Sequence, residues 1–233
     1  MTLGRCWAVV PAAGSGRRIG ADTPKQYLEL NGKAMLQWTL EALLSHPRIE
    51  GVVIVLAGND AYWHTLTLTT DKPVVTVTGG QKREASVKNG LQALLEQGLT
   101  EQDWVMIHDA ARPCLRHTDI DRLIDACRQH PDGALLAMPA RDTMKRADYE
   151  GRSGQTVERD GLWHALTPQM FRIGPLLHAL KKAADQGLAV TDEASAMEHA
   201  GSYPLLVEGR SDNIKITCFE DLALAAHYLN NAR

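Results

Sequence analysis

The sequence has few cysteines and no long apolar segment. Its 4 cysteines are far apart and form no C-x-x-C pair, which fits a reducing cytoplasm. Two of them, Cys6 and Cys127, lie among apolar residues, where a thiol packs as a small hydrophobic group. The apolar stretch before Pro11 is too short for a signal peptide, and no run approaches the roughly 20 residues of a membrane span. These absences predict a soluble cytoplasmic protein with no membrane partner. The cysteines are Cys6, Cys114, Cys127 and Cys218.

An excess of positive charge is also missing. The 25 Lys and Arg are outnumbered by 28 Asp and Glu, which gives a net charge of -3 and a pI near 6.3. Nucleic acid is therefore not an expected partner, and any cations that bind phosphate must be gathered locally. The length of 233 residues is sufficient for one buried core, so we expect a single domain over residues 1–233.

Short runs rich in valine and isoleucine alternate with longer stretches of helical period. This order is typical of βαβ units, in which a parallel sheet is buried on both faces. We predict an α/β fold of the Rossmann-like kind, with a mostly parallel central sheet, helices on both faces and a final helix that packs back on the core. The predicted strands cover residues 6–10, 51–56, 73–78, 104–108 and 134–138, and the apolar helical stripes cover 36–44, 87–95, 173–180 and 219–229.

The segment 141–160 breaks this alternation because it is rich in charge and glycine and poor in large apolar residues. It cannot bury itself, so it forms either a disordered surface loop or a β-hairpin arm. We favour an arm that turns near residues 150–154 and leans on a second subunit, because an isolated hairpin is only marginally stable.

The first predicted strand leads into a loop of small residues with the glycine spacing G-x-G-x-x-x-G. This spacing misses the dinucleotide fingerprint, and no G-K-[ST] follows, so the loop is not a Walker A motif. Small residues nevertheless let backbone amides approach a phosphate, and this loop is placed where α/β sheets bind ligands. A tight turn with solvated arginines is the alternative. Cations that favour the phosphate are supplied by Arg17, Arg18 and Lys25.

Further candidate residues follow other predicted strands. Gly79 and Gly80 open a helix after the strand 73–78, either as a simple turn or as the second wall of a nucleotide pocket. Asp109 follows the strand 104–108 and either caps a helix or faces the same pocket. His108 before it is expected to be a packed neighbour rather than a base.

Two later segments have simpler structural interpretations. Alternation in residues 214–216 points Lys215 away from its apolar neighbours, into a site or into solvent. The segment 191–195 is typical of a helix start, with Thr191 or Asp192 as the N-cap.

Together these stretches resemble the 2-C-methyl-D-erythritol 4-phosphate cytidylyltransferase family of the non-mevalonate isoprenoid pathway, and the resemblance covers nearly the whole chain. The motifs that carry it are P-A-A-G-S-G-R-R, P-K-Q-Y, G-G-Q-K-R-E-A-S-V, H-D-A-A-R-P, R-D-T-M-K-R, L-W-H-A-L-T-P-Q, T-D-E-A-S and E-G-R-S-D-N-I-K-I-T. One departure is Gln81, which stands where relatives have an acidic residue.

The resemblance implies a homodimer built partly through the arm 141–160, Mg²⁺ as cofactor, and a role for each of several residues. Arg18 and Lys25 would stabilise the transition state, while Arg159 and Lys215 would hold 2-C-methyl-D-erythritol 4-phosphate. Asp109, Arg112, Thr143 and Thr167 lie in motifs of the substrate site. CTP would be held by Ala12, Ala13, Gly14, Gly80 and Ser86.

Two other functions are compatible with these residues. One is a nucleotidyltransferase of the same architecture that uses another polyol phosphate, such as ribitol phosphate. The other is a regulatory module that binds CTP without turning it over, but such a module would have no need for the second cationic set, Arg159 and Lys215.

Overall fold

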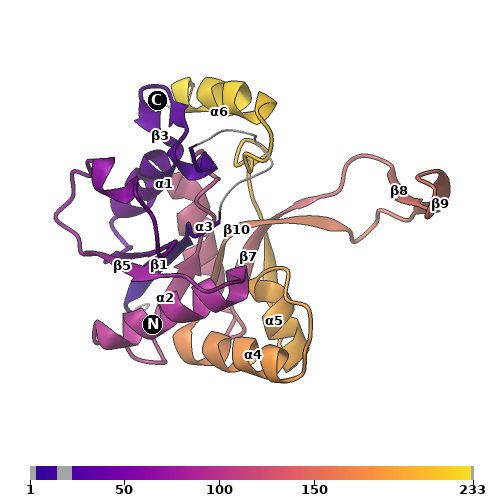
Figure 1. Cartoon of the computed structure of the whole chain (residues 1–233). Helices are drawn as coiled ribbons and strands as arrows, with labels where there is room; N and C mark the ends of the chain where they lie inside the picture. The colour runs from indigo at the N-terminus through magenta and orange to yellow at the C-terminus, as the bar shows by residue number, and fades with distance from the viewer. Residues whose placement is uncertain (1–3, 15–22, 232–233) are drawn as a thin grey trace.

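The computed structural model describes residues 4–14 and 23–231 (Figure 1). Within these ranges the core is a seven-stranded sheet of order β11-β7-β10-β6-β1-β4-β5. Its neighbouring strands pair in parallel except where β10 runs antiparallel to β6 and β7. The α/β fold predicted from the sequence is confirmed. The strands are β1 (Cys6–Pro11), β4 (Val52–Leu56), β5 (Val74–Thr78), β6 (Trp104–Ile107), β7 (Ala134–Pro139), β10 (Trp163–Arg172) and β11 (Leu205–Glu208).

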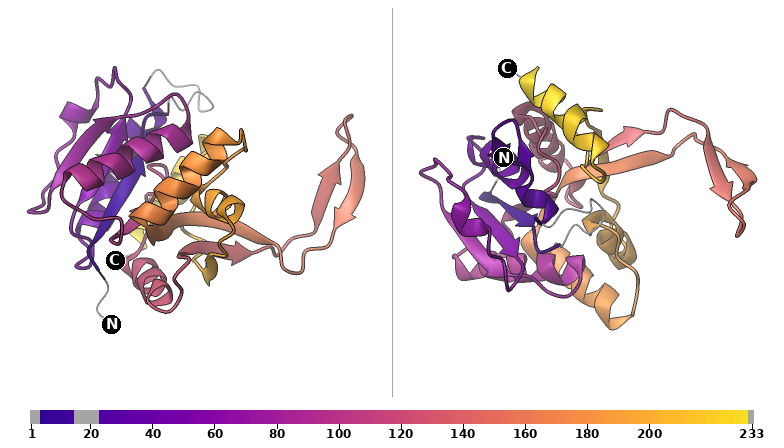
Figure 2. Two further views of the ribbon diagram at one scale, coloured as in Figure 1. Left: turned by 90° about the horizontal axis from the view of Figure 1, so that it is seen from below. Right: turned by 45° about the horizontal axis from the view of Figure 1, so that its top comes forward.

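Helices cover both faces of this sheet (Figure 2). The side chains of β1 alternate between faces, so Ala8 and Val10 join a cluster with α1 and α3, while Trp7 and Val9 join another with α2, α4 and α5. Burial on both faces explains why the strands read as continuous apolar runs. The helices are α1 (Met35–Leu44), α2 (Arg83–Glu96), α3 (His117–Cys127), α4 (Ile173–Asp185), α5 (Glu193–Ala200) and α6 (Glu220–Asn230).

The C-terminal helix α6 packs back on the body, but not on the main core as the sequence suggested. Ala225 of α6 contributes to a separate small cluster with Leu30, Met35 and Ile216. This cluster lies beside short elements that the sequence did not reveal, namely η2 (Lys25–Tyr27), β2 (Glu29–Leu30) and β3 (Lys33–Ala34). A further short turn of helix, η3, covers Trp63–Thr65.

Strand β10 was not predicted, although it lies in the middle of the sheet. Its first three residues are exposed and the next six are buried, and Pro168 lies within the strand. Proline cannot donate a ladder hydrogen bond, so it occurs at edges or bulges of sheets. Here the pairing with β7 shifts register between Ala165 and Gln169, which places Pro168 in an irregularity.

The segment 141–160 forms the predicted hairpin, in which β8 (Met144–Ala147) pairs antiparallel with β9 (Ser153–Val157). It connects β7 to β10 and projects from the body as an arm (Figures 1 and 2). An ion pair of 2.8 Å between Arg152 and Asp148 closes its turn. Tyr149 at the tip is fully exposed.

Cys6 and Cys127 are free and buried, as the sequence predicted for them. Cys114 is also free and buried, whereas Cys218 is free and exposed. Burial raises the pKa of Cys114 and of Cys127 to about 12, so both stay protonated thiols. None of the helices in the described part of the chain is long and apolar enough to cross a membrane.

Candidate functional site

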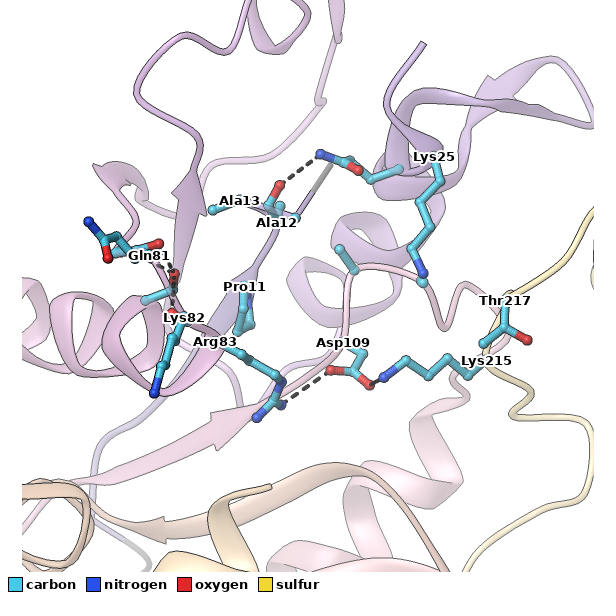
Figure 3. A pocket seen from close by; sticks show the side chains of 16 residues that line it. Pro11, Ala12, Ala13, Lys25, Gln81, Lys82, Arg83, Asp109, Lys215 and Thr217 are labelled. Carbon is cyan, nitrogen blue, oxygen red and sulfur yellow. Dashed lines mark hydrogen bonds and ion pairs between the residues drawn. The ribbon is translucent and has the colours of Figure 1, made fainter. Parts of the chain in front are cut away.

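A pocket of about 650 Å³ opens at the carboxyl edge of the sheet (Figure 3). Its walls come from the loops that follow β1, β5 and β6, together with Lys25 and Lys215. Parallel strands end at the same edge, so loops that are far apart in the sequence meet there. The pocket contains most of the predicted site residues within the described ranges: Ala12, Ala13, Gly14, Lys25, Gly80, Ser86, Asp109 and Lys215.

The glycine loops after β1 and β5 lie in direct contact. A side chain at Gly79 would place its Cβ 2.6 Å from the Cβ of Ala13 and 2.8 Å from the Ser86 hydroxyl, so only glycine fits there. The Gly80 amide donates a 3.1 Å hydrogen bond to Ser86 Oγ, which ties this loop to the first turn of α2. The two loops thus form one continuous wall, which is the second of the two alternatives that the sequence left open.

The cation Lys25 comes from the short helix η2. Its Nζ donates a 3.2 Å hydrogen bond to the carbonyl of Ile216, in the segment that carries Lys215. The next residue, Gln26, donates from Nε2 to the Ala12 carbonyl at 2.7 Å and fixes η2 against the glycine loop. Arg18, the other predicted cation, lies outside the described residues, as does Arg17.

Asp109 is the centre of a cluster of charges rather than a helix cap. The next helix, α3, begins at His117, and its N-cap is Arg116, so the capping interpretation was wrong. The Asp109 carboxylate instead accepts Lys215 Nζ at 2.7 Å and Arg83 Nη2 at 3.2 Å, with Arg112 Nε at 3.8 Å. Burial alone would raise the pKa of Asp109, but these cations hold it well below its usual range.

His108 is a buried neighbour of this cluster, as predicted. Its Nε2 contacts the Arg112 carbonyl at 3.1 Å, and its Nδ1 contacts Thr167 Oγ1 at 2.9 Å. The same hydroxyl accepts the Asp109 amide at 3.1 Å. The Arg112 carbonyl can only accept, so Nε2 carries the proton of the neutral His108 ring. Nδ1 then accepts the hydrogen bond that the Thr167 hydroxyl donates. Burial lowers the pKa of His108 to about 4.

Arg112 and Thr167 support the pocket from behind and do not line it. Arg112 Nη1 donates to the Asn213 carbonyl at 2.7 Å, and Asn213 Nδ2 donates to the Thr167 carbonyl at 2.8 Å. Both contacts anchor the segment that ends in Lys215. The alternation predicted for this segment is present, since Ile216 is buried and Lys215 is exposed on the pocket side.

Thr143 and Arg159 are not brought into the pocket of this chain. Both lie on the exposed arm, where Arg159 Nη1 donates to the Arg141 carbonyl. The residues that the family resemblance assigns to the substrate thus fall into three groups: Asp109 and Lys215 in the pocket, Arg112 and Thr167 behind it, and Thr143 and Arg159 on the arm.

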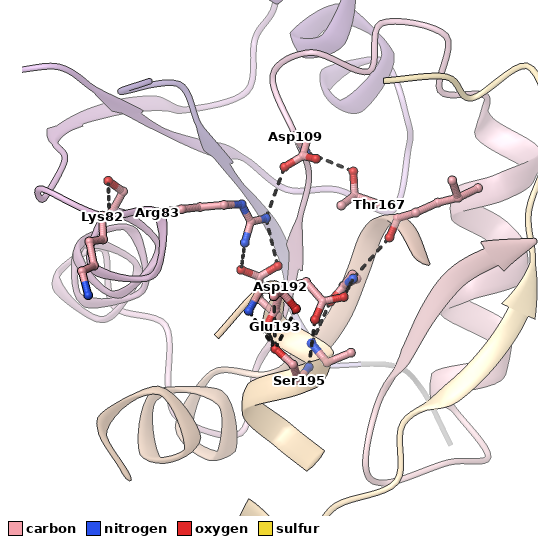
Figure 4. Close-up of polar contacts among 12 residues, drawn as sticks. Lys82, Arg83, Asp109, Thr167, Asp192, Glu193 and Ser195 are labelled. Carbon is pink, nitrogen blue, oxygen red and sulfur yellow. Dashed lines mark hydrogen bonds and ion pairs between the residues drawn. The ribbon is translucent and has the colours of Figure 1, made fainter. Parts of the chain in front are cut away.

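Arg83 and Glu193 were not predicted as site residues. Arg83 begins α2 and lines the pocket, and its guanidinium bridges Asp109 and the buried carboxylate of Glu193 (Figure 4). Asp192 is the N-cap of α5 with a capping box to Ser195, so the predicted helix start is confirmed. That local signal gave no indication that Glu193 points inward.

The described part of the protein offers few ligands for a metal ion. Within residues 4–14 and 23–231, no three His, Cys, Asp or Glu side chains gather in a way that could hold a metal. Asp109 is the carboxylate among the described pocket residues, and cations already occupy it. Mg²⁺ in nucleotide sites usually keeps several waters and binds substrate phosphates, so the residues present fit this ion only if phosphates and water supply most of its ligands.

A glycine-walled, cation-lined pocket at the carboxyl edge of a parallel sheet is the arrangement of a nucleotide-binding α/β protein. Comparison with known proteins gives the particular family. Residues 6–231 match the family model described as 2-C-methyl-D-erythritol 4-phosphate cytidylyltransferase, and the chain belongs to this family of nucleotidyltransferases.

Curated proteins and solved structures agree. A 2-C-methyl-D-erythritol 4-phosphate cytidylyltransferase of Vibrio atlanticus is 55% identical over 96% of this chain and 94% of its own. One from Pseudomonas aeruginosa is 52% identical over 93% of this chain and 92% of its own. The structure of the Francisella tularensis protein of the same name superposes with a TM-score of 0.83 at 36% identity, over 96% of this chain and 99% of that one.

Proposed function

We propose that this chain transfers the cytidylyl group of CTP to 2-C-methyl-D-erythritol 4-phosphate, releasing pyrophosphate, in isoprenoid precursor synthesis. The observation that carries the proposal is the placement of two lysines from distant segments, Lys25 and Lys215, on one pocket whose other wall is the pair of glycine loops. Such a pocket accommodates two phosphate groups, one on each substrate.

CTP occupies the wall of small residues. The backbone amides near Ala12, Ala13 and Gly14, together with Gly80 and Ser86, bind the nucleotide, and cytosine is recognised by backbone groups between the two glycine turns. The close contact of the two loops at Gly79 supports the assignment, because it keeps the wall free of a side chain at that position and leaves the backbone accessible.

The acceptor's phosphate oxygen attacks the α-phosphorus of CTP in line with the departing pyrophosphate. A phosphate monoester is already an anion, so no general base is required. Catalysis then consists of positioning and of stabilising the charge that grows on the phosphoryl oxygens. Lys25 and Arg18 act on that charge, while Lys215 positions the acceptor.

A Mg²⁺ ion bound together with CTP would neutralise the charge of the triphosphate and fix its shape. The engagement of Asp109 by Arg83 and Lys215 supports this route, because a carboxylate that already serves two cations is a poor further ligand.

The functional unit is a homodimer in which the arm 141–160 of one single-domain subunit reaches the pocket of the other. Thr143 and Arg159 then complete the acceptor site from the partner's side. Their position on an exposed arm, away from this chain's own pocket, supports that assignment. The free thiols support a cytoplasmic location.

The proposal is tested by pyrophosphate release with Mg²⁺, each of CTP, UTP, ATP and GTP, and a panel of polyol phosphates. We expect turnover with CTP and 2-C-methyl-D-erythritol 4-phosphate and little with the other pairs. Preference for ribitol phosphate would assign another acceptor. Binding of CTP without turnover for any acceptor would identify a regulatory module, and equal rates with UTP would contradict recognition of the cytosine amine.

A further inference from the structure

A network of ion pairs connects the interior of the protein to the acceptor side of the pocket. Glu193 is completely buried, and Arg83 binds both of its carboxylate oxygens, at 2.6 and 3.1 Å. The second guanidinium nitrogen also donates to Asp109 at 3.2 Å. On its far side Asp109 accepts Lys215 at 2.7 Å, so one carboxylate joins Arg83 to Lys215 (Figures 3 and 4).

The buried end of this ion-pair network, Glu193, is held in a fixed place. Gln169 of β10 donates to the Asp192 carboxylate at 2.8 Å, and its Oε1 accepts the amide of Ala194 at 2.8 Å. Both contacts fix the first turn of α5 against the centre of the sheet. Glu193, between Asp192 and Ala194, therefore has a defined position, and the bidentate geometry transmits that position to the planar Arg83 guanidinium.

The charges of this ion-pair network explain why a substrate site would contain such a network. A carboxylate beside an incoming phosphate repels it unless cations neutralise the carboxylate. Asp109 holds Lys215 in place, and Arg83 neutralises Asp109 without having to move. Glu193 in turn prevents Arg83 from extending into the pocket, where it would compete with Lys215 for phosphate.

We infer that Arg83, anchored by Glu193, is a positioning residue that orients Asp109 and through it directs Lys215 at the acceptor's phosphate. This inference rests on the proposed function, because the acceptor is identified there. The acceptor side of the pocket is thereby supported by Arg83 of α2 and Glu193 of α5. Otherwise α2 belongs to the nucleotide wall and α5 to the core.

The decisive variant is the double substitution Arg83→Met with Glu193→Gln. Arg83→Met alone leaves a buried carboxylate unpaired and is expected to lower the melting temperature. Adding Glu193→Gln removes that charge and restores the melting temperature, while Asp109 still lacks its guanidinium partner. A structural role and a positioning role are thereby separated within one pair of variants.

We expect the double variant to raise KM for 2-C-methyl-D-erythritol 4-phosphate roughly ten- to hundredfold, the range for losing a hydrogen bond to a charged group. KM for CTP should remain near that of the wild type. The matched control is Arg5→Met with Glu50→Gln, the same two substitutions in a 2.9 Å pair that is half exposed, next to the start of β1. This control should leave both KM values unchanged.

The outcomes distinguish the inference from the proposed function. If the wild type releases no pyrophosphate from CTP and the acceptor, both fail. If the wild type is active and the double variant has a normal acceptor KM, only the positioning role is overturned. The same conclusion follows if restoring the melting temperature also restores the acceptor KM, or if KM for CTP rises as much as KM for the acceptor.

Discussion

The ammonium of Lys215 lies 2.7 Å from the carboxylate of Asp109, although the two residues are far apart in the sequence. Lys25, by contrast, donates to the backbone carbonyl of Ile216. Lys215 is thus held by an opposite charge, and Lys25 is tied to the backbone of the segment that carries Lys215.

The roles proposed for the two lysines predict different kinetic effects. Lys25→Ala should lower kcat steeply, by roughly two decades if it resembles the loss of one preorganised donor to the transition state. Lys215→Ala should mainly raise KM for the acceptor and change KM for CTP little. Initial rates over both substrate concentrations test the prediction.

Lys181→Ala, on the exposed side of α4, is the matched control and should have wild-type constants. Near-normal kcat in Lys25→Ala would contradict the assignment. So would a Lys215→Ala enzyme whose sole defect is weaker binding of CTP, because the two halves of the pocket would then be exchanged.

The glycine walls were predictable from the sequence because they depend on local patterns. A buried apolar run followed by small residues marks the end of a parallel strand, and all such ends share one edge of the sheet. The partnership of Arg83 with Glu193 depends on the fold instead. These residues are 110 positions apart, and Glu193 reads locally as an ordinary acid in the first turn of a helix.

Strand β10 was missed for a related reason. Its central residues, Thr167, Pro168 and Gln169, show no apolar alternation. They lie inside the sheet because their polar groups have partners there: Gln169 binds the start of α5 and Thr167 binds His108. Polar residues with partners that are remote in the sequence carry no periodic signal. The predicted hairpin was found because its composition differs from that of the rest of the chain.

Gly79→Ala should weaken CTP binding. Its new Cβ would lie 2.6 Å from the Ala13 Cβ, so the two glycine loops must separate. Overpacking of this kind costs about 1–3 kcal/mol, and part of this cost should appear as a KM for CTP raised by about tenfold. Gly58→Ala is the control, because its nearest neighbour would be at an ordinary 3.5 Å. An unchanged KM for CTP in Gly79→Ala would place the nucleotide elsewhere.

The arm can be tested by mixing two impaired chains. A Lys25→Ala chain and an Arg159→Ala chain, unfolded together and refolded, should recover activity well above that of either chain alone at a low acceptor concentration. In a mixed dimer one site then contains both Lys25 from its own chain and Arg159 from the other. Separate refolding followed by mixing is the control. If Arg159 acts on its own chain's pocket, every site in the mixture carries one substitution and no activity returns.

His108 should make the protein less stable in acid. Burial lowers its pKa from 6.5 to about 4 in the folded chain. Between these pH values the unfolded chain binds a proton that the folded chain does not, so the free energy of unfolding falls as the pH falls from 6.5 towards 4. Because the side chain is fully buried, the effect of His108 alone should approach about 3 kcal/mol at pH 4.

Urea unfolding of the wild type and of His108→Gln at several pH values between 7 and 4 measures this effect. Glutamine is neutral throughout and has both an acceptor for Thr167 and a donor for the Arg112 carbonyl. The variant should lose stability at pH 7 through poorer packing, and its disadvantage should shrink as the pH falls. His46, whose pKa burial also lowers, is present in both proteins and cancels in the difference. Parallel curves for the two proteins would show that His108 does not remain neutral in the folded chain at these pH values.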